Sequence, residues 1–175
     1  SRGLGDVYKR QNLYDYGIQD NKTKNMQATL CAIAIDENDN LNTVNVGDSR
    51  MYRYRRGNIK QISRDQSLVQ LLYEEGTITA DEKKHHVHKN IIFPVMGNIS
   101  AEPKPDIKNL NEIMKYGDLI LICSDGLSDY VSCTEMEDIL DLPAKLPKRL
   151  ERLVKLAIDN GSQDNITIIA LCCYD

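Results

Sequence analysis

Four consecutive large aliphatic residues at positions 119–122 form a strongly apolar run. A run of this length predicts a strand that is buried on both faces. The run leads directly into Cys-Ser-Asp-Gly-Leu-Ser-Asp, which places Asp125 and Asp129 just beyond the end of the strand. A polar turn is the usual exit from a buried strand, so this segment by itself is explained equally well as a turn.

Between residues 29 and 62 the chain carries four short apolar segments separated by polar or glycine-containing turns. These segments are 29–35, 41–46, 51–55 and 59–62. Each has the length and the flanking residues of a β-strand. Four successive strands with short connections predict an antiparallel meander.

Three short helices are predicted in the middle of the chain. Residues 67–75 contain leucines at positions i, i+3 and i+4, which is the spacing of one helical face. Thr79 and Glu82 resemble a capping box that opens a second helix. Thr134 is predicted to cap a third helix, which continues through Leu140.

The longest predicted helix lies near the C-terminal end. Pro147 is placed in its first turn, and Gly161 ends it. Its apolar stripe contains Leu146, Leu150, Leu153, Val154, Ala157 and Ile158. A final buried strand is predicted over 166–173. The order of strands and helices is that of an α+β protein rather than a βαβ repeat.

The N-terminal residues do not continue these patterns. Residues 1–11 show no clear periodicity, and we expect them to be a non-native or read-through segment. Residues 12–20 predict the tail of a helix. The expected domain therefore covers residues 12–175, a length sufficient for one hydrophobic core.

The composition excludes several classes of protein. The 175 residues carry 22 basic and 26 acidic side chains, a net charge of −4. This balance argues against nucleic acid as a partner and provides no polybasic patch for a membrane. No apolar run approaches the roughly 20 residues of a membrane-spanning helix, and no signal peptide is recognised. The five cysteines have no metal-ligand spacing, which predicts reduced thiols and a cytoplasmic protein.

Three acidic elements lie at the ends of predicted strands, around Asp48, Asp125 and Asp164. Strand ends that meet at one edge could bring these side chains together. Carboxylates gathered without neutralising partners raise one another's pKa, so such a cluster usually holds a cation. Ligation by oxygen alone suits Mg²⁺ or Mn²⁺. Spacing alone supports a candidate site for one of these ions and nothing more specific.

The only three histidines, His85, His86 and His88, stand together between lysines. Clustered histidines suggest a metal site, but this group lacks a cysteine or carboxylate at a recognised spacing. The neighbouring lysines favour a solvated or anion-facing loop over a zinc site.

Several polar motifs follow one another in a fixed order from Met26 to the C-terminus. They are Met26 to Thr29, Asn45 to Tyr52, Arg64 to Val69, Glu75-Gly76, His86 to Asn90, Leu121 to Asp129 and Asp164 to Thr167. The series resembles the metal-dependent protein phosphatase family (PPM, type 2C), and its bacterial serine/threonine phosphatases above all. An ordered series of this kind is far more specific than any single motif.

The resemblance implies a four-layer α-β-β-α sandwich, in which helices flank two antiparallel sheets. It also implies a centre of two to three Mg²⁺ or Mn²⁺ ions at one end of the sandwich. By position, Asp125 and Asp164 match late ligands of a binuclear pair. Asp48 and Asp129, together with Asp125, match the ligands of a third, weaker ion.

The activity implied by the resemblance is hydrolysis of phosphoserine and phosphothreonine by metal-activated water. The region from Glu75 to Asn90 matches a mobile flap beside the active site. Its residues His86, His88, Lys89 and Asn90 are candidates to meet a phosphopeptide. The implied partners are phosphorylated proteins and a Ser/Thr kinase that acts on the same substrates.

The chain also departs from the family's pattern. The family begins with a phosphate-gripping arginine and an Asp-Gly-x-Gly-Gly loop, and neither occurs here. The usual Met-Gly-Thr-Thr is replaced by Met26-Gln27-Ala28-Thr29, and Asp-His-Ser by Asp65-Gln66-Ser67. We therefore expect residues 12–175 to be the C-terminal portion of a phosphatase domain that is inactive alone.

Two other interpretations remain open from the sequence. The chain could be a non-catalytic pseudophosphatase, a regulatory binding domain on the same fold. It could also be a plain Mg²⁺-binding globular domain whose acidic turns are structural. The ordered motif series argues against the last of these.

Overall fold

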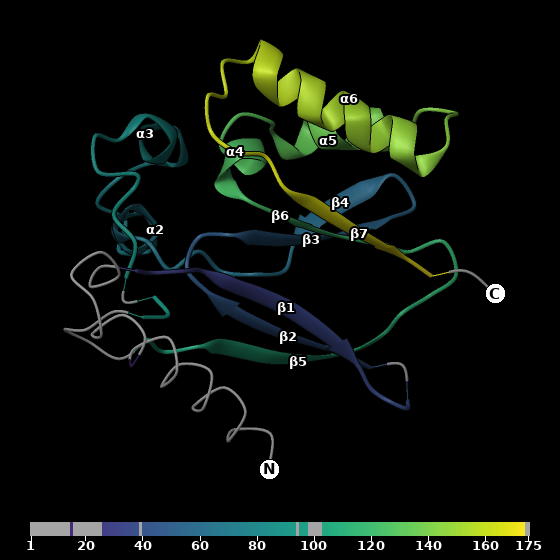
Figure 1. Cartoon of the computed structure of the whole chain (residues 1–175), viewed down its shortest axis with the longest axis horizontal. Helices are drawn as coiled ribbons and strands as arrows, with labels where there is room; N and C mark the ends of the chain where they lie inside the picture. Colours follow the sequence, from purple (N-terminus) through teal and green to yellow (C-terminus); the bar gives the residue numbers. More distant parts are fainter. Residues whose placement is uncertain (1–14, 16–25, 39, 94, 98–102, 174–175) are drawn as a thin grey trace.

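The computed structural model describes residues 15, 26–38, 40–93, 95–97 and 103–173 (Figure 1). The predictions of a non-native segment over 1–11 and of a helical tail over 12–20 lie outside these residues, apart from Asp15. The described chain forms two antiparallel sheets, which confirms the predicted two-sheet arrangement.

The first sheet has three strands in the order β1-β2-β5. They are β1 (Leu30–Ile35), β2 (Asn40–Val46) and β5 (Asp106–Ile113). The strand β5 was not predicted, because its exposed and partly buried residues around Ile107 form no apolar run. Its pairing with β2 therefore depends on the tertiary structure.

The second sheet has four strands in the order β4-β3-β6-β7. They are β3 (Arg50–Arg55), β4 (Asn58–Gln61), β6 (Leu119–Cys123) and β7 (Ile168–Cys172). The prediction of a single meander over 29–62 is wrong, because β1 and β2 belong to one sheet and β3 and β4 to the other. The change of sheet follows Gly47, whose φ of 111° lies in a region that favours glycine.

The strand β6 is buried on both faces, as its sequence predicts. Leu119, Leu121 and Cys123 pack in a cluster with helix residues. Ile120 lies in the other cluster, between the sheets, with Met51. The two cores therefore meet at this strand.

Three helices cover one face of the second sheet (Figure 1). They are α4 (Asp125–Ser128), α5 (Cys133–Leu140) and α6 (Leu146–Asp159). The cap of α5 is Ser132, which forms a capping box with Glu135, and not Thr134 as predicted. Asn160 is the C-cap of α6, one residue before the predicted Gly161. Three of the four predicted layers thus lie within the described residues.

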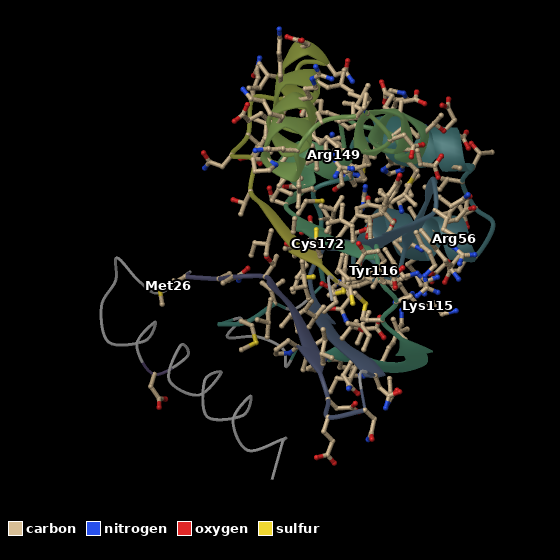
Figure 2. All side chains as sticks on the ribbon, turned by 90° about the vertical axis from the view of Figure 1, so that its right-hand side faces the viewer. Met26, Arg56, Lys115, Tyr116, Arg149 and Cys172 are labelled. Atoms are coloured by element: carbon tan, nitrogen blue, oxygen red, sulfur yellow. The ribbon has the colours of Figure 1, made fainter. Side chains whose placement is uncertain are left out.

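Two short helices, α2 (Leu68–Glu74) and α3 (Ala80–His85), lie at one end of the sandwich, beside α4 (Figure 1). The capping box of Thr79 and Glu82 at the start of α3 is confirmed. The other end carries the turns at Arg56 and at Lys115 and Tyr116 (Figure 2). The candidate site lies at the end with α2 and α3.

Candidate metal centre

The register of the second sheet brings three chain segments to the same end. Arg50 at the start of β3 lies opposite Cys123 at the end of β6. Cys123 in turn lies opposite Ile168 at the start of β7. The acidic segments around Asp48, Asp125 and Asp164 therefore gather at one end of the sandwich, because each adjoins one of these strand ends.

A pocket of about 420 Å³ opens at this end. Both carboxylates and cations line it. The charged lining residues are Asp48, Asp65, Asp125, Asp129, Glu135, Arg50, Lys83, Lys84 and Lys89. Three of the four predicted metal ligands thus share one pocket, and Asp164 lies just beyond its lining.

Close packing at Gly126 holds the Asp164 loop against α4. A Cβ atom at Gly126 would lie 2.4 Å from the carbonyl oxygen of Asn165. The same oxygen accepts a hydrogen bond from the Ser124 hydroxyl at 3.1 Å, and this hydroxyl accepts one from the Thr167 amide at 3.1 Å. The glycine of the Asp-Gly motif is therefore required by a close backbone approach.

Among the residues that the structure describes, no cation forms an ion pair with Asp48 or Asp125, and other carboxylates lie near both. Burial raises the pKa of Asp125, and the neighbouring carboxylates of Asp164 and Asp129 raise it further. Burial also raises the pKa of Asp48, with additional repulsion from Asp125. Such partly buried, mutually repelling oxygens are an environment in which a cation is favourable.

Arg50 connects the parts of the pocket. Its Nε donates to Asp65 at 2.9 Å, and its Nη1 donates to the carbonyl oxygen of Ser128 at 2.8 Å. Its Nη2 lies 3.3 Å from Oδ1 of Asp129. One guanidinium group thus holds the loop around Asp65 and the end of α4, and it fixes the position of Asp129.

The flap, defined as residues 75–90, contributes three lysines to the pocket, Lys83, Lys84 and Lys89, two of which pair with its aspartates. Lys83 lies 3.6 Å from Asp65, and Lys89 lies 3.3 Å from Oδ2 of Asp129. Asn90 also lines the pocket, whereas His86 and His88 do not. The His88 amide instead donates to Nδ1 of His86 at 3.1 Å, so these histidines interact with each other.

The donor set fits a hard divalent ion by its chemistry, because it consists of carboxylate oxygens. Within the part of the chain that the structure describes, however, no three His, Cys, Asp or Glu side chains are close enough to hold one ion. The carboxylates share a pocket without converging on a single point.

Sequence reasoning did not identify Arg50, Asp65 and Lys83 as parts of the site. Asp65 has 2% of its side chain exposed, and it accepts a second hydrogen bond from Gln61 at 2.8 Å. A charged residue in a polar loop carries no local sign of burial. Only a charge partner supplied by another element reveals its role.

Among the described residues, no helix is long and apolar enough to cross a membrane. All five cysteines lie in the described part of the chain, and all are free thiols. Burial raises the pKa of the Cys123 thiol to about 12 and that of Cys31 to about 11. These thiols are therefore protonated at neutral pH and unsuited to bind a metal or attack a substrate.

Known proteins share this arrangement. The serine/threonine protein phosphatase PstP of Mycobacterium tuberculosis is 36% identical over 150 residues, which are 86% of this chain and 28% of that protein. The structure of the S. agalactiae serine/threonine phosphatase matches 96% of this chain and 67% of its own, with a TM-score of 0.85 and 32% identity. The catalytic domain of PstP in complex with two manganese ions matches 95% of this chain and 67% of its own, with a TM-score of 0.79 and 31% identity. No family model matches.

The two-sheet sandwich with its flanking helices is thus the fold of serine/threonine protein phosphatases of known structure. The chain belongs to the PPM-type family of these phosphatases, as its ordered motifs indicate. It spans 28% of the length of PstP and 67% of the S. agalactiae chain.

Proposed function

We propose that this protein is a metal-dependent phosphatase that hydrolyses phosphoserine and phosphothreonine in phosphorylated proteins. The observation that carries the proposal is the single pocket lined by Asp48, Asp125 and Asp129 in a chain of the PPM family. The two manganese ions in the structure of the related PstP domain support a metal in this pocket. Mg²⁺ or Mn²⁺ would supply an activated water and a clamp for the phosphoryl group.

Four aspartates would hold the ions in this proposal. Asp125 and Asp164 contribute to a binuclear pair, and Asp48 and Asp129 join Asp125 around a third ion. The raised pKa of Asp48 and of Asp125 supports this assignment, since both shifts come from burial and from neighbouring carboxylates. A bound dication would relieve that repulsion.

We further infer that this chain has little or no activity by itself. The supporting observation is that, within the described residues, no three candidate ligands are close enough to hold one ion. Two aspartates of a binuclear pair hold its ions only weakly. Full activity therefore requires oxygen ligands beyond those that the described residues provide.

Substrate would approach over the flap. Lys89 and Asn90 line the pocket, and Lys84 adds a further positive charge at its edge. His86 and His88 lie outside the pocket and would contact more distant parts of a phosphopeptide. A Ser/Thr kinase acting on the same proteins is the expected opposing enzyme. The free thiols support the cytoplasmic location in this proposal, and the opposition to a kinase would make the role one in signalling.

One observation favours a second function, that of a non-catalytic regulatory domain. Both carboxylate oxygens of Asp129 are occupied by cations of the chain itself, Oδ1 by Arg50 and Oδ2 by Lys89. A pseudophosphatase could keep such internal ion pairs in place of metal ions. It would then bind a phosphoprotein without hydrolysing it.

The two functions are separated by Mn²⁺ binding and peptide turnover measured on the same samples. Mn²⁺ binding is measured from the electron paramagnetic resonance signal of the free ion. Turnover is measured with a phosphothreonine-containing peptide at millimolar Mn²⁺. The variant is Asp125→Asn, which keeps an acceptor for the Gly126 amide that Asp125 now binds at 2.9 Å. The control is Asp138→Asn, at an exposed position of α5.

We expect wild type and Asp138→Asn to bind Mn²⁺ equally well. Asp125→Asn should bind the ion at least about tenfold more weakly. Turnover of the peptide by this chain should be negligible. Absence of Mn²⁺ binding in the wild type would refute the metal-dependent function. Mn²⁺-dependent turnover that Asp125→Asn abolishes would confirm the phosphatase and refute the inferred inactivity. Binding of the peptide that requires its phosphate but not Mn²⁺, without turnover, would favour the regulatory domain.

A further inference from the structure

The flap is attached to the sandwich mainly through charged side chains. No residue between 75 and 90, all of them described, is fully buried, and the partly buried ones are Ile78, Lys83, His86 and Lys89. A segment without fully buried apolar side chains gains little from the hydrophobic effect. The ion pairs of Lys83 and Lys89 therefore contribute much of the stability that holds the flap over the pocket.

Lys83 and Lys89 each contact a carboxylate and an aromatic ring. The Nζ of Lys83 lies 3.6 Å from Asp65 and 5.9 Å from the ring centre of Tyr73. The Nζ of Lys89 lies 3.3 Å from Asp129 and 5.4 Å from the ring centre of Tyr130. Tyr73 belongs to α2, whereas Asp129 and Tyr130 directly follow α4. Lys89 thus links the flap to the acidic end of α4.

The two cations on Asp129 differ in their freedom to move. Arg50 belongs to β3 and is also held by Asp65 and by the Ser128 carbonyl oxygen. Its contact with Oδ1 of Asp129 is therefore part of the rigid sandwich. Lys89 belongs to the flap, and its side chain is 34% exposed. The oxygen Oδ2 can consequently be released by movement of the lysine alone.

We propose that Lys89 is a displaceable counter-cation of Asp129, which weakens divalent-ion binding there and couples that binding to release of the flap. One carboxylate oxygen cannot bind an ammonium group and a dication at the same time, because the two positive charges would repel each other strongly. An ion that takes Oδ2 must therefore remove Lys89, and the flap then loses its contact with α4. This inference rests on the proposed function, in which Asp129 is a ligand of the weakest ion.

The first test is a Mn²⁺ titration of wild type, Lys89→Met and Lys84→Met, in which the electron paramagnetic resonance signal measures the free ion. Methionine keeps the length and apolar stem of lysine and removes its charge. Lys84 is the matched control, because it lies on the same flap, is exposed and also lines the pocket. We expect Lys89→Met to bind the weakest ion about two- to five-fold more tightly, the range of a half-exposed ion pair, and Lys84→Met to behave as wild type. An equal gain in both variants would show a general effect of charge and overturn the proposal.

The second test is amide hydrogen exchange of residues 79–90. Without metal, Lys89→Met should exchange faster than wild type across this segment, while amides of β6 remain unchanged and report an intact fold. Saturating Mn²⁺ should speed exchange of the wild-type flap and change that of Lys89→Met little. A flap that exchanges more slowly with Mn²⁺, or that Lys89→Met leaves unchanged, contradicts the proposal.

The two tests distinguish this proposal from the proposed function. If wild type binds Mn²⁺ through Asp125 and Lys89→Met binds it equally well, the role of Lys89 is refuted and the metal-dependent function stands. If neither protein binds Mn²⁺, both are refuted.

Discussion

Two aspartates at opposite ends of β6 have pKa values that the fold shifts in opposite directions. Asp118 precedes the strand and is 1% exposed. Burial alone would raise its pKa, but hydrogen bonds from Arg55 and from the Lys115 amide outweigh burial and lower it. Asp125 follows the strand, and burial and like charges raise its pKa. The structural carboxylate is neutralised within the chain, and the candidate ligand is not.

We predict that Asp118→Asn destabilises the protein at pH 7 by about 2 kcal/mol, since it removes charged hydrogen bonds from a buried site. Arg55 holds both carboxylate oxygens, with Nε and Nη2 each at 2.6 Å. Because the folded-state pKa is lowered, this stabilisation is present above the unfolded-state pKa of about 4. It is lost as the pH falls through the folded-state pKa.

Urea unfolding of wild type and Asp118→Asn at pH 7 and pH 3 measures this difference. The gap between the two proteins should shrink at pH 3, because this pH lies below the unfolded-state pKa of about 4 and part of the stabilisation is already lost there. Asp138→Asn, at an exposed position, should match wild type at both values. A gap of equal size at pH 7 and pH 3 would contradict the role of charge.

At the scale of elements, the site depends on how α4 packs against the loop before β7. The Ser162 hydroxyl donates to the Gly126 carbonyl oxygen at 2.8 Å, and the Ser124 amide donates to that of Thr167 at 3.1 Å. These bonds hold both ends of the loop that carries Asp164. The short helix and the loop therefore form one unit that sets the separation of Asp125 and Asp164.

Gly126→Ala should separate these two elements. The added methyl group would meet the Asn165 carbonyl oxygen, so we expect a loss of about 1–3 kcal/mol in stability. Mn²⁺ affinity should also fall, because Asp164 moves away from Asp125. Gly117→Ala is the control for a loss of stability without a contact. The φ of Gly117, 83°, disfavours alanine, but the residue lies near the end of the sandwich opposite the pocket, and no atom lies within 4 Å of the added Cβ. Unchanged Mn²⁺ binding in Gly126→Ala would show that this packing does not position Asp164.

At the scale of the whole molecule, the second sheet ends in an apolar strand, β7, beside which the described part of the chain places no further strand. Within the described residues, β7 pairs only with β6. The prediction of a buried strand over 166–173 is wrong for one face of β7, on which Ile169 is 59% exposed and Leu171 is 37% exposed, while the alternate residues pack under the helices. An apolar strand with one free edge is a site where another chain can add.

We predict that this edge makes the chain self-associate, and that Ile169→Thr reduces the association. Threonine keeps the β-branched shape that suits a strand, so stability should change by less than about 0.5 kcal/mol. Light scattering across a concentration series measures the effect. Ile158→Thr is the control, because Ile158 is similarly exposed at 56% but lies on α6. Equal effects of both substitutions would implicate general surface hydrophobicity instead of the strand edge.

The sequence by itself determined the elements whose signals are local. The double-sided burial of β6, the apolar stripe of α6 and the capping box at Thr79 depend on residues within a few positions of one another. The stripe was predicted one residue too far, because Ile158 is 56% exposed. The ordered motifs also identified the two-sheet fold and the family. Local spacing and hydrogen bonding decide these features, so they can be read along the chain.

Only the tertiary structure decided the division of the first four strands between two sheets, the strand β5 and the charge pairs of the pocket. Arg50 and Asp129 are 79 positions apart, and Lys89 and Asp129 are 40 apart. No short segment encodes such contacts, because they exist only where sheet register and helix packing bring distant side chains together. The sequence therefore proposed four carboxylates as metal ligands, and the fold decided which cations lie beside Asp129.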